Sequence, residues 1–210
     1  VSDVMMPRMN GYKLCKTIKE DINISHIPVI LLTARDDRQS QISGYKNGAD
    51  GYLSKPFEVE MLMELIRNRL KNREYTKKRY LNAGLIPTPE ESTISLTDET
   101  FLIKLNSIIQ ENIENSNLGI QFICQEVGLG RSSLYNKLKA LTGMGANEYI
   151  SKLRIEKAIT LISGTDMPFS EIAEKTGFTT PSYFSTAFKQ YTGETPSQYK
   201  ERKKKGLADK

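Results

Sequence analysis

Two stretches in the C-terminal half of the chain carry polar side chains that suit contact with nucleic acid. At helical spacing, the positions facing away from an apolar stripe hold short hydrogen-bonding groups and a few cations, without a carboxylate. Phosphates would repel carboxylates there, whereas hydroxyl, amide and cationic groups can bind phosphate oxygens and base edges. An ordinary solvated helix face more often mixes glutamate with lysine. The candidates are Arg131, Ser132, Ser133, Asn136 and Lys137 in the first stretch, and Thr180, Ser182, Tyr183, Ser185, Thr186, Lys189 and Gln190 in the second.

An internal repeat relates the two stretches at an offset of 49 residues, which becomes 50 after one extra residue in the second copy. The matched pairs include Gly128 with Gly177, Leu134 with Phe184, Leu138 with Phe188, Lys139 with Lys189 and Tyr149 with Tyr199. Each copy predicts a helix, a tight turn relieved by glycine, a second helix and a glycine stop, which is the helix-turn-helix layout. We expect the second helices over 131–141 and 181–191, burying Leu134, Leu138 and Leu141 in one, and Phe184, Ala187, Phe188 and Tyr191 in the other.

A further predicted helix, over residues 147–162, connects the two copies. At about 1.5 Å per residue, its roughly 16 residues span about 24 Å. With the width of the two copies added, that length is compatible with reading helices about 34 Å apart, which is one turn of DNA. The second reading helix has a clear start signal, because Thr180 can cap it and Pro181 suits its first position.

Residues 101–202 resemble the AraC/XylS type of DNA-binding domain, on the strings GLGRSSLYNKLKALTGMGANEYISKLRIEKAITLI and FSEIAEKTGFTTPSYFSTAFKQYTGETPSQYK. The resemblance covers the full domain and implies an all-α fold that binds double-stranded DNA through two helix-turn-helix units. The departures are Cys124 for the usual alanine, Gly130 for the usual cap serine, and Gly145–Ala146 for the usual Ser-Pro. The last softens the turn into the connecting helix and leaves the binding face unchanged.

The N-terminal part alternates short apolar runs with amphipathic stretches, which is typical of parallel α/β units. We predict strands at 28–32 and 50–54, and helices at 11–21, 37–48 and 57–72. The strings VSDVMMPRMNG, PVILLTA and DGYLSKPF make this part resemble the later portion of a response-regulator receiver domain. The resemblance implies that Asp3 accepts a phosphoryl group from a histidine kinase. It also implies that Thr33 bonds the phosphoryl oxygens, that Lys55 offsets their charge and that Tyr52 turns inward with Thr33.

The same resemblance implies a Mg²⁺ ion held by an acidic pair after the first strand, by Asp3 and by the carbonyl of Met5. Mg²⁺ and a lysine together neutralise the crowded oxygens when a carboxylate attacks phosphorus. The first two strands and the acidic pair are absent from this sequence, so we expect Mg²⁺ in a complete receiver but no firm binding here. A sheet without its central strand would expose Val1–Asp3 as a bare edge, which favours a piece of a longer regulator. The alternative is a natural truncated form in which Asp3 is a remnant.

The composition is that of an ordinary globular protein, with 38% hydrophobic and 26% charged residues. The apolar run Ile27–Leu32 falls far short of the roughly 20 residues of a membrane span, and no signal peptide is visible. We therefore expect a cytoplasmic protein without membrane contact. The net charge of +5 comes mostly from the tail that begins at Lys200, so charge alone is a weak argument for DNA. Cys15 and Cys124 are expected as reduced thiols, and His26 as a loop residue.

We predict an incomplete flavodoxin-like (CheY-like) α/β receiver with three parallel strands, followed by an all-α domain with two helix-turn-helix units. The regular structure should break at about 81–97, after a helix extended by 71–80, and Thr97 should cap the next helix. The predicted parts are the receiver at 1–72, a helical extension and linker at 73–97, the DNA-binding domain at 98–205 and a tail at 206–210.

This combination predicts a sequence-specific transcription regulator controlled by aspartyl phosphorylation in a two-component phosphorelay, and not an enzyme. The string LTDETFLIKLNSIIQENI resembles the hybrid histidine-kinase sensors of Bacteroidetes, whose kinase activity would lie upstream. The expected partners are double-stranded DNA and a histidine kinase as phosphodonor, while contact with RNA polymerase and homodimerisation are left open. The rival interpretations are a phosphorylation-independent DNA-binding protein, a protein-interaction module, and a phosphotransferase that turns over at Asp3.

Overall fold

The structure is a computed structural model that describes residues 1–34, 42, 44–83 and 95–208. Its strands are β1 (Ser2–Asp3), β2 (Ile30–Thr33) and β3 (Gly51–Ser54). Its helices are α1 (Gly11–Glu20), α3 (Val59–Ala83), α4 (Leu96–Glu111), α5 (Ile120–Val127), α6 (Arg131–Thr142), α7 (Ala146–Gly164), α8 (Phe169–Lys175), α9 (Pro181–Thr192) and α10 (Pro196–Ala208). By their contacts, the residues form two compact units: Val1–Ile103 with Ser132–Gly143, and Lys104–Arg131 with Met144–Lys210.

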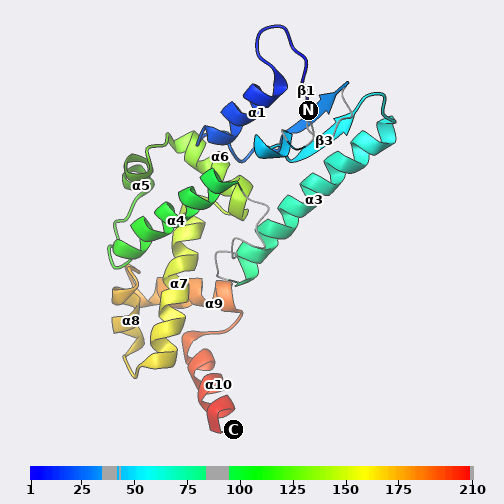
Figure 1. Cartoon of the computed structure of the whole chain (residues 1–210). Coiled ribbons are helices and arrows are strands. Elements are labelled where there is room, and N and C mark those ends of the chain that lie inside the picture. Colours follow the sequence, from blue (N-terminus) through cyan, green and yellow to red (C-terminus); the bar gives the residue numbers. More distant parts are fainter. Residues whose placement is uncertain (35–41, 43, 84–94, 209–210) are drawn as a thin grey trace. The chain divides into compact units, whose positions relative to one another are not determined.

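The first unit is built on a parallel sheet with the strand order β1-β2-β3 (Figure 1). Asp3 pairs with Leu32, and Thr33 pairs with Ser54, so the carboxyl ends of the strands lie along one edge. The sheet and α1 share a small apolar core made of Val4, Cys15, Val29, Leu31 and Ala49. The predicted three parallel strands are therefore confirmed, although β2 and β3 each begin later than the apolar runs that signalled them.

Helix α1 begins where the side chain of Asn10 accepts a hydrogen bond from the Lys13 amide at 2.8 Å, which satisfies one of the first-turn donors. Cys15 lies on its buried face, and burial raises the pKa of the Cys15 thiol. Both cysteines are free, as predicted. His26 lies in the turn between α1 and β2, again as predicted, and burial lowers its pKa.

Helix α3 runs through Ala83, which confirms that the charged stretch 71–80 extends the preceding helix. The predicted linker at 81–97 lies largely outside the described residues, and so does half of the predicted helix at 37–48, of which residues 42 and 44–46 are helical. The prediction that Thr97 caps the next helix is wrong. Helix α4 begins at Leu96, and the hydroxyl oxygen of Ser95 accepts from the Asp98 amide at 3.2 Å. Thr97 instead donates its hydroxyl to the Lys19 carbonyl at 2.8 Å.

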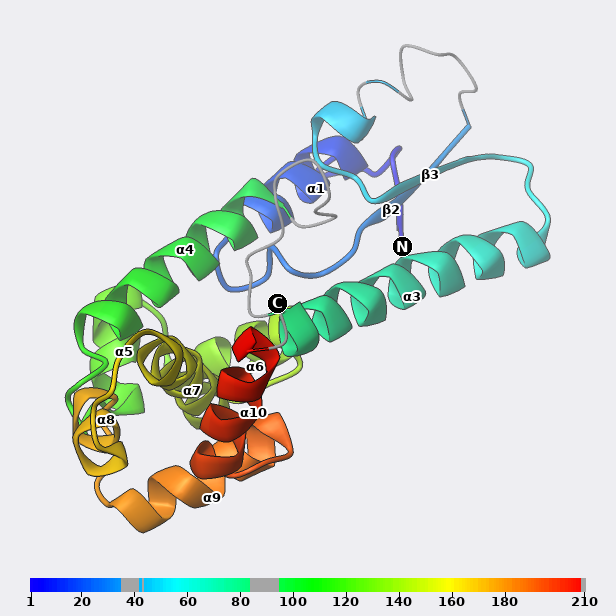
Figure 2. The ribbon, with the colours of Figure 1, turned by 90° about the horizontal axis from the view of Figure 1, so that it is seen from below.

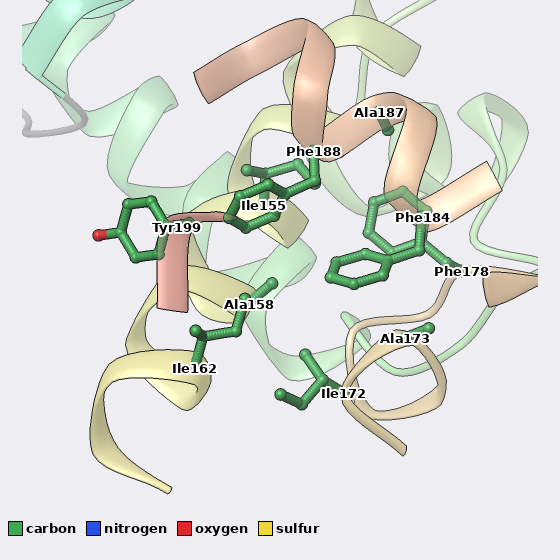
Figure 3. Close-up of a cluster of buried hydrophobic side chains, with 10 residues drawn as sticks. All are labelled: Ile155, Ala158, Ile162, Ile172, Ala173, Phe178, Phe184, Ala187, Phe188 and Tyr199. Carbon is green, nitrogen blue, oxygen red and sulfur yellow. The ribbon is translucent and has the colours of Figure 1, made fainter. Parts of the chain in front are cut away.

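In the second unit, helices α8, α9 and α10 pack against α7 (Figure 2). The packing buries a cluster of apolar side chains rich in aromatic rings (Figure 3). The Phe184 ring lies 5.4 Å from that of Phe178 and 5.7 Å from that of Phe188, centroid to centroid, at tilted or edge-on angles that favour ring pairs. The cluster consists of Ile155, Ala158, Ile162, Ile172, Ala173, Phe178, Phe184, Ala187, Phe188 and Tyr199.

The helices of the repeat agree with the sequence prediction to within two residues at each end. Helix α6 covers the predicted 131–141, α9 the predicted 181–191 and α7 the predicted 147–162. The predicted apolar stripes are buried, except that Tyr191 is only half-buried. Across the described part of the chain, no helix is long and apolar enough to cross a membrane.

The turn between α8 and α9 needs a glycine for two independent reasons. Gly177 has a φ of +70°, in the left-handed region that side chains disfavour. A Cβ atom placed there would also lie 2.2 Å from the carbonyl oxygen of Ile113. The crowding comes from the Arg154 side chain as well, which lies over the Phe178 ring and donates to the Asn115 carbonyl at 2.7 Å.

Candidate functional site

The carboxyl edge of the sheet brings Asp3 and Lys55 together. Asp3 ends β1, Lys55 directly follows β3, and the Lys55 ammonium forms an ion pair with Oδ2 of Asp3. The other carboxylate oxygen, Oδ1, accepts from the Met5 amide at 3.1 Å. The hydrogen bond from Lys55, then that from Met5, hold the pKa of Asp3 below its usual value. The carboxylate is therefore ionised at neutral pH, as a phosphoryl acceptor must be.

Thr33 and Tyr52 occupy neighbouring strands beside this pair. Thr33 ends β2, is almost fully buried, and its carbonyl accepts from the Lys55 amide at 2.6 Å. Tyr52 lies on β3, half-buried, with its hydroxyl 3.4 Å from the hydroxyl of Tyr12 on α1. The partner Tyr12 was missed by sequence reasoning, because its position in the first turn of a helix carries no signal for a contact with a strand 40 residues away.

Gly11 allows helix α1 to begin directly against the backbone of Asp3. The Gly11 amide donates to the Val4 carbonyl at 3.0 Å. A Cβ atom at position 11 would lie 2.5 Å from the backbone carbonyl oxygen of Asp3, well inside contact distance. Any larger residue would have to displace the backbone that carries the Asp3 carboxylate.

The described residues do not supply a complete magnesium site around Asp3. Mg²⁺ prefers six oxygen ligands and is usually held by one or two carboxylates with phosphate and water. Here the two predicted ligands are the Asp3 carboxylate, which is already ion-paired with Lys55, and the Met5 carbonyl. No group of three or more His, Cys, Asp or Glu side chains that could hold a metal occurs among the described residues. Among the described residues, the donor set around Asp3 thus falls short of a complete magnesium site.

Helix α9 presents the second candidate reading face. Its cap is as predicted: the Thr180 hydroxyl oxygen accepts from the Tyr183 amide at 3.1 Å, and Pro181 occupies the first turn. The predicted reading residues are exposed, apart from Ser185, which is half-buried: Thr180, Ser182, Tyr183, Thr186, Lys189 and Gln190. The exposure of these six side chains is as expected of a reading face, and their contact with DNA stays a prediction.

Helix α6 agrees with its prediction except at Lys137. Arg131, Ser132 and Asn136 are exposed and Ser133 is half-buried. The Arg131 guanidinium donates to Oε1 of Gln121 on α5 at 3.2 Å. Lys137, predicted as a DNA contact, is 0% exposed and forms a buried ion pair with Asp98, so its ammonium group does not reach the reading face.

Two exposed residues of α6 were missing from the predicted reading face. Tyr135 is 54% exposed, and Lys139 is exposed two positions beyond the buried lysine. The repeat could have found Lys139, since it matches Lys189 at the 50-residue offset. The same alignment matches Lys137 with Ala187, which is buried, and so it could have corrected the error at Lys137.

Comparison with known proteins gives the two parts of the chain separate matches. Residues 1–67 match the response regulator receiver domain, and residues 123–202 match a helix-turn-helix domain. Over 202 residues the chain is 43% identical to the "Histidine kinase P4" of Formosa agariphila, across 96% of this chain and 15% of that protein. Over 71 residues it is 49% identical to the heme response regulator HssR of Staphylococcus saprophyticus, across 34% of this chain and 30% of that protein.

Among solved structures, the chain is similar to the C-terminal domain of AraT, a response regulator from Geobacillus stearothermophilus. The match has 31% identity and a TM-score of 0.46, over 49% of this chain and 84% of that domain. The chain thus joins a receiver domain to a helix-turn-helix domain, the arrangement of a DNA-binding response regulator. It spans only a small part of the Formosa agariphila protein, about 15% of its length.

Proposed function

We propose that this chain is the output end of a two-component phosphorelay, in which phosphorylation of Asp3 controls DNA reading by α6 and α9. The observation that carries the proposal is the ion pair of Asp3 with Lys55 at the carboxyl edge of the sheet, in the same chain as the two acid-free reading faces. A histidine kinase is the proposed phosphodonor, and double-stranded DNA the proposed ligand.

At the acceptor site, each residue has a separate proposed role. The Asp3 carboxylate attacks the phosphorus of a phosphohistidine on the kinase, which forms an acyl phosphate on Asp3 as the P–N bond breaks and the histidine imidazole leaves. The Lys55 ammonium, now paired with Asp3, would then pair with the phosphoryl oxygens. Thr33 donates its hydroxyl to one of those oxygens, and Tyr52 follows Thr33 inward. Mg²⁺ would further neutralise the phosphoryl oxygens in a complete receiver, where Asp3 and the Met5 carbonyl would be two of its ligands.

At the DNA interface, the proposed contacts divide by chemistry. Arg131 and Lys189 pair with phosphates or guanine edges, while Asn136 and Gln190 suit adenine edges. The hydroxyls of Ser132, Ser182 and Thr186 add contacts to the backbone, as do the exposed Lys139 and Tyr135, which we include in the interface. Contact with RNA polymerase, homodimerisation and a cytoplasmic location stay predictions.

DNA binding by the whole chain tests this function. A duplex selected from a random-sequence library should bind with an affinity that falls steeply as salt rises, because phosphate contacts release counterions. Arg131→Ala and Lys189→Ala should each weaken binding by about tenfold or more, the loss expected for one base or phosphate contact of about 1–3 kcal/mol. Binding that is absent, or insensitive to salt, would contradict the proposal.

Phosphorylation tests the acceptor site separately. With acetyl phosphate and Mg²⁺, we expect this chain to take up little phosphate, because its magnesium ligands are incomplete. A chain extended upstream to supply the acidic pair should be labelled stoichiometrically, and Asp3→Asn in that longer chain should abolish the label. Full labelling of the present chain at Asp3 would mean that the metal argument is wrong.

A further inference from the structure

A buried polar network in the first unit joins three segments that are far apart in sequence. Ser25 lies in the turn between α1 and β2, Asp98 in the first turn of α4, and Lys137 in the middle of α6. The Lys137 ammonium donates to the Ser25 hydroxyl oxygen at 2.7 Å and pairs with Oδ1 of Asp98. Ser25 in turn donates its hydroxyl to the same Asp98 oxygen at 2.7 Å, so the three groups close a cycle.

The network is closed to solvent. Ser25 and Lys137 are 0% exposed and Asp98 is 2% exposed. The Lys137 ammonium also lies 5.1 Å from the centroid of the Phe101 ring, a cation–π contact from α4. Burying a lysine and an aspartate is costly unless both are paired and hydrogen-bonded, and here each charge has a partner. A group held this way has one arrangement, so the network fixes where α6 lies relative to α4 and the Ser25 turn.

The network holds the inner side of α6 and leaves its outer side free. Arg131, Asn136 and Lys139 remain exposed on the same helix. Lys137 therefore cannot act as a DNA contact in this arrangement, but it can set the position of the residues that do. Ser25 belongs to the segment that matches the receiver domain, and Lys137 to the segment that matches the helix-turn-helix domain.

We propose that Lys137 is a positioning residue for DNA reading, which seats α6 through Ser25 and Asp98 so that the exposed face of α6 meets DNA correctly. The inference rests on the proposed DNA-binding function and adds a residue that acts through its neighbours. It also gives the receiver segment a direct bond to a reading helix. Loosening that bond should cost DNA affinity, because binding must then re-seat the helix.

A first test needs no DNA. Ser25→Ala deletes the hydroxyl and keeps the Lys137–Asp98 pair, so the whole chain should still fold. Backbone hydrogen exchange should become at least several-fold faster in α6 and stay unchanged in α9. The matched control is Thr97→Ala, which removes the neighbouring bond to the Lys19 carbonyl without touching α6 and should leave α6 exchange unchanged. Unchanged α6 exchange in Ser25→Ala would overturn the proposal.

A second test separates positioning from direct contact. With the selected duplex, Ser25→Ala should weaken binding about fivefold or more, because a single hydrogen bond contributes about that factor and the change removes two. The slope of log affinity against log salt should stay the same in Ser25→Ala and in Lys137→Met, because neither change removes a phosphate contact. Lys139→Met on the exposed face should lower that slope by about one. A slope lowered equally by Lys137→Met would make Lys137 a phosphate ligand and overturn the proposal.

The two failures are distinguishable. If the wild-type chain bound no duplex, the proposed function would fall, and the hydrogen-exchange result would still decide whether the network seats α6. If the wild-type chain bound DNA but Ser25→Ala changed neither exchange nor affinity, the proposed function would stand and the positioning role would fall.

Discussion

Helices α6 and α9 are the second helices of the two copies of the repeat, but they are packed through different kinds of interaction. At the 50-residue offset Lys137 matches Ala187, and both positions are buried. On α9 the alanine lies in the aromatic cluster with Phe184 and Phe188 (Figure 3). On α6 the lysine instead meets a carboxylate and a hydroxyl.

The comparison shows that the interaction that stabilises a helix most need not be the one that fixes its position most narrowly. Apolar packing tolerates small shifts, because dispersion and hydrophobic burial are not directional. A buried ion pair adds little net stability over an apolar pair of the same size, but it penalises every arrangement in which one charge loses its partner. We infer that apolar packing sets the position of α9 at Ala187, whereas the polar partners of Lys137 set the position of α6.

Substitution by methionine at the matched positions 137 and 187 should have the largest effect on the free energy of unfolding. It should also distinguish polar from apolar packing of the two helices. Lys137→Met leaves the buried Asp98 carboxylate without an opposite charge and should cost about 3–5 kcal/mol of unfolding free energy. Ala187→Met only overfills the aromatic cluster and should cost about 1–3 kcal/mol. Urea unfolding followed by circular dichroism measures both. Combining Lys137→Met with Asp98→Leu should recover most of the loss, and a double variant no better than the single one would contradict this account.

Alanine at the two turn glycines should show the next largest difference. Gly128 and Gly177 both have positive φ, which costs an alanine about 1–2 kcal/mol. At Gly128 an added Cβ meets no atom within 4 Å, so Gly128→Ala should cost little more than that. At Gly177 the Ile113 carbonyl blocks the Cβ, and Gly177→Ala should cost about 3 kcal/mol or more. Equal shifts in the unfolding midpoint would mean that the second turn can relax.

Alkaline pH should weaken the contact of α9 with α7. The Tyr191 hydroxyl donates to the Glu148 carbonyl on α7 at 2.7 Å, and burial raises the pKa of Tyr191 to about 12. An unfolded tyrosine has a pKa of about 10, so this contribution to stability is complete below about pH 10 and is lost as pH rises towards 12. Burial likewise raises the pKa of Tyr149, which donates to Asn106, to about 12.

Phenolate absorbance would measure this effect. Two of the ten tyrosines should titrate late, together with a loss of helical signal. Tyr191→Phe should remove one of these late titrations. Ten tyrosines that all titrate near pH 10 would show that these hydroxyls are not held in the fold.

The smallest effects on stability belong to the reading faces themselves. Arg131→Ala and Lys189→Ala remove exposed side chains and should change the unfolding free energy by no more than about 0.5 kcal/mol. The same variants should lose DNA affinity strongly, as stated above. A comparable loss of stability and of binding would mean that these residues support the helices and do not read DNA.

The spacing of apolar residues, together with capping residues, glycines and prolines at the ends of elements, was sufficient to predict most of the fold. The apolar stripes of α6 and α9, the Thr180 cap and the parallel strands all follow from local pattern, since a helix or strand buries residues at a fixed spacing. The cap of α4 shows the limit of that method: Ser95 and Thr97 are both good caps, and the bond from Thr97 to Lys19 decided between them.

The candidate site was harder to predict wherever partners are distant in sequence. A lysine among polar neighbours on a helix is normally exposed, and nothing near Lys137 signals a carboxylate 39 residues earlier or a serine 112 residues earlier. The contact of Tyr52 with Tyr12 was hidden for the same reason. The local sequence pattern predicts which side of a helix a residue lies on, but a partner from a distant segment can still bury a residue that the pattern predicts to be exposed.

Because Lys137 is buried, the reactivity of its amine reports whether α6 is in its packed position. An amine-reactive reagent that modifies the exposed Lys139 finds the Lys137 amine sealed behind Ser25, Asp98 and Phe101. These two amines lie two residues apart, on opposite sides of one helix, and the burial of Lys137 depends on the packing of that helix. Their labelling ratio, read by mass spectrometry, would follow the seating of α6 in any mixture, without engineered probes.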